Sequence, residues 1–424
     1  MVANHQPRSE QHRLASFAST AILRQQRLIF LGGMFVFGVA TIALFLLSST
    51  RPQLLVEYGL IVPDVFNMSQ SLRAFALDDP PWLRVHELPG PWLLYGSLMA
   101  PDAPTCLIVN SLLIGASAVC WWRIAVRTLA RPGWAVLAII ANPYLVLAML
   151  GPNKEIPLMF LNLLLAWVVV QRPTLWLASS LLICAAVYPF RDGYAVMLGM
   201  WVVAVWWYRS RLATATAILA VAACLAVLLA TPLAELFRFV GRQYRFVDDP
   251  SRLPAFATWI LGETGFDPTS AVVQPLLLVL RVVYNSTSQA LFPVLLTDAG
   301  RLNFLGAAYF LNGLVVLIGF PVGIAVLKGR DGRCTWSVIA ASALVSTIVL
   351  SSVSPQIQPR YFMPLWPMAY LVLLSANRRL VIQATLGAIG LVTLVMTVYA
   401  LWGYPPARAA PFDGEAPAEV AGAR

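Results

Sequence analysis

Residues 28–49 read LIFLGGMFVFGVATIALFLLSS, a run of 22 residues without a charged side chain. Since an α-helix rises about 1.5 Å per residue, such a run is long enough to cross the roughly 30 Å hydrocarbon core of a bilayer. Arg24 and Arg27 precede it. The run therefore predicts a membrane-crossing helix. Because no small-residue cleavage site follows it, we expect a retained signal-anchor.

Similar apolar runs recur along the rest of the chain. Of its 424 residues 59% are hydrophobic and 11% are charged, and the mean hydropathy is +0.75. Soluble domains carry about 25% charged residues, so this composition excludes an ordinary soluble enzyme, a disordered scaffold and a secreted domain. We predict an all-α, polytopic transmembrane helical bundle of about eleven spans, at 28–49, 105–122, 133–150, 156–170, 174–190, 193–208, 212–231, 303–327, 335–353, 361–376 and 380–401.

The distribution of charge gives these spans an orientation. Connectors on one side are short and carry 15 of the 29 basic residues, whereas the other side carries 17 of the 19 acidic residues. The positive-inside rule places the basic side in the cytoplasm. The net charge of +10 therefore indicates topology rather than nucleic-acid binding. We predict a cytoplasmic tail at 1–27, a transmembrane domain at 28–401 with large outer loops at 50–104 and 232–302, and a disordered tail at 402–424.

Several kinds of site are excluded by what the sequence lacks. There is no phosphate-binding loop and no glycine-rich dinucleotide motif, so an ATP-driven motor within this chain is excluded. The five cysteines show no C-x-x-C spacing, and the chain has three histidines, so we expect no metal site of the zinc or haem type. The apolar stretch 271–296 is interrupted by polar residues, and we expect it to form one or two helices that lie at the outer interface or that enter the membrane and return to the same side.

Charged side chains concentrate at the predicted outer turns. Lys154 and Glu155 lie in the turn before 156–170, Arg191 lies in the turn before 193–208, and Arg360 opens the span at 361–376. Ionisable groups at the edge of a membrane are costly and are therefore candidates for function. A single turn of this kind is about equally consistent with a solvated loop or a topology marker. In the outer loop, Arg238, Arg242 and Arg245 would share one helix face, and an acidic-lipid patch is an alternative interpretation of them.

Taken together, these residues predict a cationic cavity at the outer leaflet. Arginine offers paired donors to phosphate oxygens and lysine acts as a point charge, so a lipid-linked diphosphate is the obvious ligand. A nearby carboxylate can remove a proton from an attacking sugar hydroxyl. Both requirements are those of glycosyl transfer from a polyprenyl-linked donor.

The first outer loop carries a family resemblance. It reads Pro63-Asp64-Val-Phe-Asn-Met-Ser-Gln-Ser-Leu-Arg73, continues through His86 and Glu87, and ends in a proline-rich entry to the next apolar run. This order resembles the first outer loop of membrane glycosyltransferases of the C-type fold, and Asp64 matches their essential acid. The segment Arg360-Tyr361-x-x-Pro-x-x-Pro also resembles an arginine-tyrosine-proline segment of those enzymes. Two features depart from the family: Asp64 is followed by Val65 rather than a second acid, and the chain has no soluble outer domain at its C-terminal end.

Over the whole chain the layout resembles the polysaccharide repeat-unit polymerases of bacterial envelopes, including exopolysaccharide polymerases of the xanthan type. The resemblance implies an enzyme of the bacterial inner membrane whose active site faces the periplasm. Its substrate would be an undecaprenyl-diphosphate-linked saccharide, and a flippase and a chain-length regulator would be its partners. We expect no nucleic acid and no cofactor; a divalent metal at Asp64 is compatible with the chemistry, but the abundance of cations leads us to expect none.

Roles for individual residues follow from this chemistry. Asp64 is the first choice for the general base, Glu155 the second and Glu87 the third. The diphosphate and its lipid would be held by Lys154, Arg191, Arg360, Tyr361, Arg238, Arg242 and Arg245.

Three alternative functions remain open. The first is a C-type-fold transferase that adds a single sugar from a polyprenyl-phosphate donor. The second, from a different class, is a lipid-linked oligosaccharide flippase or another transporter, although the spans show no internal repeat of the kind such proteins usually have. The third is an acyltransferase, for which His86 is the only histidine on the outer side.

Overall fold

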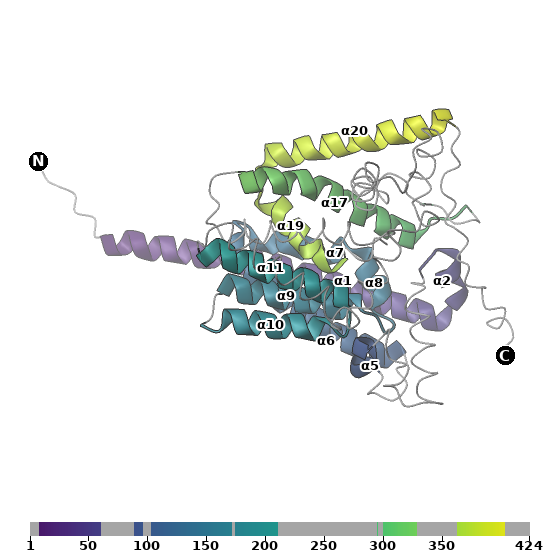
Figure 1. Ribbon diagram of the computed structural model, residues 1–424, viewed down its shortest axis with the longest axis horizontal. Coiled ribbons are helices and arrows are strands. Elements are labelled where there is room, and N and C mark those ends of the chain that lie inside the picture. The colour runs from purple at the N-terminus through teal and green to yellow at the C-terminus, as the bar shows by residue number, and fades with distance from the viewer. Residues whose placement is uncertain are drawn as a thin grey trace, which may run out of the picture.

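The computed structural model describes residues 8–60, 89–95, 103–171, 174–210, 295, 300–328 and 363–402 (Figure 1). Every element assigned within these ranges is a helix, as the composition predicts. The helices are α1 (Arg8–Thr50), α2 (Pro52–Glu57), α5 (Pro89–Tyr95), α6 (Ala103–Thr128), η2 (Pro132–Val136), α7 (Leu137–Ile140), α8 (Pro143–Ala148), α9 (Glu155–Gln171), α10 (Trp176–Val187), α11 (Asp192–Ser210), α17 (Phe304–Lys328), α19 (Trp366–Ser375) and α20 (Arg378–Trp402).

Within the described residues, four helices are long and apolar enough to cross a membrane. They are Ala21–Thr50, Ala103–Thr128, Phe304–Val326 and Arg378–Thr397. Shorter apolar helices occur at Glu155–Gln171, Trp176–Val187 and Met363–Ser375. These helices indicate a helical membrane protein, whereas the predicted number of about eleven spans stays a prediction. The predicted spans at 212–231 and 335–353, the tail at 402–424 apart from its first residue, and nearly all of 271–296 lie outside the described residues.

Helix α1 begins before the predicted span. The span was predicted at 28–49, but the helix already begins at Arg8 and runs without a break to Thr50, while the cytoplasmic location of 1–27 stays a prediction. The physical reason is local: between Arg8 and Arg27 the sequence contains no glycine or proline to end a helix. Farther along α1, the buried Gln26 accepts a hydrogen bond through Oε1 from the Gly133 N–H at 3.0 Å.

The predicted continuous span at 133–150 was wrong, because the structure divides this segment into η2, α7 and α8. Pro143 lacks an N–H, and a proline also disfavours helical backbone at the preceding residue. Accordingly Asn142 has φ −108° and ψ 84°, outside the helical region. The chain therefore bends inside the bundle, between α7 and α8.

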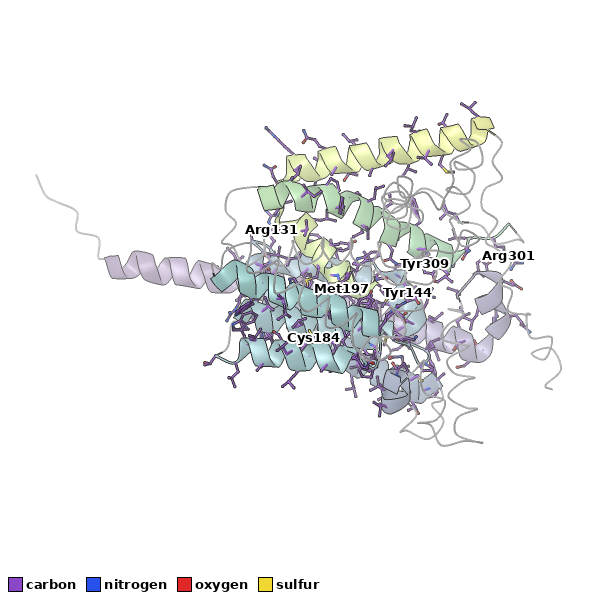
Figure 2. The ribbon with its side chains drawn as sticks, viewed as in Figure 1. Arg131, Tyr144, Cys184, Met197, Arg301 and Tyr309 are labelled. Carbon is purple, nitrogen blue, oxygen red and sulfur yellow. The ribbon has the colours of Figure 1, made fainter. Side chains whose placement is uncertain are left out.

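Helices that follow one another directly along the chain run antiparallel, so that their turns gather at two ends, whereas α6 and α9 pack in parallel (Figure 1). Helices α9, α10 and α11 follow one another through short turns, and α6 packs along α9 (Figure 1). The beginnings of α6, α9, α11 and α17 and the end of α1 lie at one end, which the charge pattern predicts to be outside. The end of α6 and the beginning of α20 lie at the other end, and Figure 2 labels Arg131 and Arg301 toward these opposite ends. This grouping agrees with the predicted alternation of the spans.

The core of the bundle is formed by apolar side chains with single polar links between segments. Trp121 of α6 is fully buried and donates from Nε1 to the Ala135 carbonyl at 2.7 Å. Asn162 of α9 donates from Nδ2 to the Pro364 carbonyl at 3.1 Å, just before α19. Both bonds end on carbonyls that lie in or next to 3₁₀ turns, so the links hold irregular segments against regular helices.

Replacing Trp121 by Phe should leave the Ala135 carbonyl without its buried donor. We expect a loss of about 1–3 kcal/mol of stability, because an unsatisfied buried acceptor costs its desolvation. The measurement is the unfolding midpoint of the purified protein in detergent. Trp134→Phe is the matched control, since Trp134 is 46% exposed; equal effects of the two changes would contradict the importance of the Trp121 bond.

Candidate functional site

Three of the ten predicted site residues lie in the described part of the chain. They are Lys154, Glu155 and Arg191. The other seven, Asp64, Glu87, Arg238, Arg242, Arg245, Arg360 and Tyr361, lie outside the described residues, so their roles stay predictions.

Asn153 caps the helix that carries Glu155. Its Oδ1 accepts a hydrogen bond from the Ile156 N–H at 2.9 Å, which is the usual N-cap contact. Its Nδ2 donates to the carbonyls of Ala148 and Gly151, each at 3.0 Å. One carboxamide thus closes the turn between α8 and α9 and begins α9. In the sequence, an asparagine two residues before an acid at a predicted helix start is a signal for such a cap. We did not assign Asn153 a role from the sequence.

Glu155 is a buried acid in the first turn of α9. It is 4% exposed, and its Oε2 accepts a hydrogen bond from the Lys154 N–H at 3.1 Å. Negative charge is favoured at a helix N-terminus, where free N–H groups and the helix dipole point toward it. The Lys154 side chain is half-buried beside it. This geometry holds one carboxylate oxygen in place at the predicted outer end of the bundle.

Asn110 is the residue that binds this turn to the rest of the protein. It is fully buried in α6, and its Nδ2 donates to the carbonyls of Met149 at 2.9 Å and Gly151 at 3.1 Å. Its Oδ1 accepts from the Tyr95 hydroxyl at 2.6 Å. An asparagine within an otherwise apolar span is an unusual polar group at membrane depth. That signal is visible in the sequence, but we did not use it to identify a site residue.

Tyr95 ends α5 and is fully buried. Burial, and to a smaller extent Cys106 and Glu155 nearby, raise the pKa of Tyr95 above its ordinary value. Its phenol therefore stays protonated and serves as a donor to Asn110. The chain Tyr95–Asn110–Gly151–Asn153 ends one residue from Lys154, so α5 and the Lys154–Glu155 turn form one hydrogen-bonded unit.

The opposite end of α5 contacts the second charged turn. The Gly90 N–H donates to the Pro189 carbonyl at 2.7 Å. A Cβ on Gly90 would lie 2.7 Å from the Phe190 ring and 2.8 Å from its backbone nitrogen, so only glycine fits this approach. Arg191 follows directly, and its guanidinium lies 5.6 Å from the centre of the Tyr194 ring, within cation–π range.

Helix α5 therefore bridges the two turns that carry Lys154, Glu155 and Arg191. The structure places these three residues at the same end of the bundle, and their predicted roles stay predictions. Lys154 and Arg191 supply positive charge there, and Glu155 supplies a carboxylate. Such a set can bind an anionic group and accept a proton.

A second charged cluster at this end has a structural role. Arg301 forms an ion pair with Glu57, and its guanidinium lies 5.5 Å from the centre of the Tyr58 ring. The Phe304 N–H donates to the Tyr58 carbonyl at 3.0 Å, joining α2 to the start of α17. Because the Arg301 and Glu57 side chains are 46% and 41% exposed, the pair contributes little stability.

No group of three or more histidine, cysteine, aspartate or glutamate side chains that could hold a metal ion occurs in the described part of the chain. Cys106, Cys120 and Cys184 are buried, and none of them forms a disulfide with another described residue.

The fold and the charged end define the class of the protein as a helical membrane protein with a polar site at one end of its bundle. The comparisons with known proteins do not narrow this class. No protein-family model, no curated protein and no solved structure matches this chain.

Replacing Asn110 by Leu should strongly destabilise the protein. The change keeps the approximate volume but leaves the Met149 carbonyl and the Tyr95 hydroxyl without the hydrogen bonds that Asn110 makes to them, whereas the Gly151 carbonyl keeps its hydrogen bond from Asn153 Nδ2. At about 1–3 kcal/mol for each buried unsatisfied group, we expect a loss of about 2–6 kcal/mol. Tyr95→Phe removes one donor and should cost less. Thermal unfolding of the purified variants measures both; an Asn110→Leu variant as stable as Tyr95→Phe would contradict the central role of Asn110.

Proposed function

We propose that this chain is a membrane-embedded glycosyltransferase that polymerises undecaprenyl-diphosphate-linked oligosaccharide repeat units. The reaction takes place at the outer leaflet of the bacterial inner membrane and yields an exopolysaccharide or O-antigen. The observation that carries this proposal is the convergence of buried Glu155, Lys154 and Arg191 at one end of the bundle, where α5 holds both turns.

The proposed reaction requires two kinds of group at the same place. An acceptor hydroxyl attacks the anomeric carbon of the donor saccharide, a new C–O bond forms, and the bond to the lipid diphosphate breaks. A carboxylate takes the hydroxyl proton, and cations stabilise the negative charge that develops on the departing diphosphate. The activated diphosphate bond supplies the driving force, so the absence of a nucleotide-binding motif from the sequence is consistent with this reaction.

The carboxylate in this mechanism is Asp64 or Glu155. Asp64 has the better family resemblance, whereas Glu155 has the supporting geometry: it is 4% exposed, held at a helix N-terminus and adjacent to Lys154. Arg360 completes the proposed diphosphate site from the segment that precedes α19. Tyr361, Arg238, Arg242 and Arg245 are the further candidates for contacts with the lipid-linked substrate, and Glu87 is the third candidate base.

One observation favours a second candidate function. The segment Pro132–Ala148 is broken inside the bundle, and broken helices at membrane depth occur in transporters, where irregular backbone lines a pathway. A lipid-linked oligosaccharide flippase is therefore the second candidate. A C-type-fold transferase of single sugars uses the same charged groups as the polymerase and differs in the saccharide it consumes.

A strain lacking the gene separates these functions. Its polyprenyl-linked saccharides are extracted, and their length and the leaflet they face are determined. Loss of the polymerase should leave single complete repeat units at the outer leaflet. Complete units confined to the inner leaflet would replace the proposal with the flippase, and units that lack one sugar would replace it with the single-sugar transferase.

Variants restored to this strain test the site. Lys154→Ala and Arg360→Ala should each slow polymer formation about 30- to 1,000-fold, since loss of one group that stabilises the transition state costs about 2–4 kcal/mol. Arg301→Ala is the matched control: it removes an outer cation at the same end of the bundle but outside the proposed site, and it should leave the rate unchanged. Membrane insertion is checked for each variant by its abundance in the membrane fraction.

The same assay decides between the two carboxylates. Loss of a general base typically costs a factor of about 10²–10⁴, so whichever of Asp64→Asn and Glu155→Gln shows this loss identifies the base. Normal polymer yield from the Lys154, Arg360, Asp64 and Glu155 variants together would contradict the proposed site.

A further inference from the structure

The break between α7 and α8 contains a buried carboxamide. Asn142 is fully buried, and its side chain makes no capping bond to α8. Neither its Oδ1 nor its Nδ2 has a hydrogen-bond partner among the residues that the structure describes. An asparagine at a helix start usually accepts a bond from the first turn, as Asn153 does at α9. Asn142 therefore has a donor and an acceptor that serve no local purpose.

A second carboxamide in the same condition lies in α17. Asn312 is 1% exposed, and within the described residues both its Oδ1 and its Nδ2 lack a partner. It stands in an otherwise apolar helix, where each polar group is costly. The hydrogen bonds of Asn110 explain its presence in an apolar span. Asn312 has no such explanation among the contacts of the described residues.

The two carboxamides lie near the same helix contact. Tyr144 of α8 and Tyr309 of α17 stack with ring centres 5.8 Å apart, and Figure 2 shows the two labelled side by side. Asn142 is two residues before Tyr144, and Asn312 is three residues after Tyr309. Both asparagines therefore lie within three residues along the chain of this stacked pair, at the contact between α8 and α17.

The chemistry of the two groups selects the ligand. Each carboxamide offers a donor and an acceptor. A cation would use the oxygens alone, and α7, α8 and α17 contain no acidic residue to offset its charge. An anion would use the nitrogens alone. Enclosure of both side chains excludes a sugar or a lipid headgroup. Water is the small ligand that donates and accepts at once, and buried waters typically satisfy such groups.

We propose that Asn142 and Asn312 form a buried water-binding site between α8 and α17, at the break in the segment 132–148. Water bound there pairs with both carboxamides and makes irregular backbone tolerable at membrane depth. The site is independent of the proposed glycosyl transfer, because it uses none of the charged residues at the outer end.

Isosteric variants test whether the two asparagines act together. Asn142→Leu and Asn312→Leu should each lower the thermal unfolding midpoint of the purified full chain, because each removes part of the water's coordination and leaves the other carboxamide unpaired. The unfolding midpoint of the double variant should be no lower than that of the less stable single variant, because the double change leaves neither carboxamide behind unpaired. If each single change raises the unfolding midpoint and the two increases add, the carboxamides bind no water and do not act together, and the proposal is wrong.

Hydroxyl-radical footprinting in H₂¹⁸O tests the water directly, on the wild-type protein. Tyr144 is 1% exposed, yet radicals formed from a bound water would label it with ¹⁸O. Tyr95 is the matched control, since it is also fully buried but bonded to Asn110, and it should stay unlabelled. Labelling of Tyr144 that disappears in the double variant supports the site. Coupled variants without any labelling of Tyr144 would mean that the two carboxamides bond to each other, which overturns it.

Discussion

The hydrogen bonds of Asn110 are the interaction on which the charged end of this protein depends. In an apolar bundle, dispersion and shape alone allow neighbouring helices to slide and rotate with little penalty. A carboxamide that donates to two carbonyls and accepts from a phenol has one satisfied arrangement, and any shift leaves several groups unpaired. Asn110 therefore sets the position of α6 relative to the 149–151 turn and of α5 relative to both.

The same principle explains why polar residues in this bundle act as junctions. Trp121, Asn162 and Gln26 each connect a regular helix to an irregular stretch of backbone. Irregular segments expose N–H and C=O groups that lipid cannot satisfy, so they persist inside the bundle where a side chain supplies the missing partner. The few polar side chains of the core thus determine where the chain can leave helical geometry.

The sequence was sufficient to predict the all-helical class and the long apolar helices, because apolar length is a property of single segments. The break in the segment 133–150 could not be predicted from hydropathy, because hydropathy does not report backbone hydrogen bonding. The Asn142–Pro143 pair did indicate the break, since a proline disfavours helical backbone at the residue before it. Asn110 was overlooked for a different reason. Its partners are backbone carbonyls about forty positions away, and backbone groups carry no sequence signature. Glu155 and Arg191 were predicted to lie on the same face of the membrane, but the element that joins their turns, α5, came from a proline-rich stretch that we had interpreted only as an entry to the next span.

The length of α1 has a mechanical consequence. At 1.5 Å per residue its 43 residues measure about 65 Å, of which the span from Ala21 accounts for about 45 Å. The remaining turns form a stalk of about 20 Å that stands beyond the other helices (Figure 1). A group attached near Arg8 is consequently held away from the other described helices at a set distance (Figure 1). Rotation or tilt of the first span would be magnified at its tip, which makes that position a sensitive place for a spectroscopic distance label.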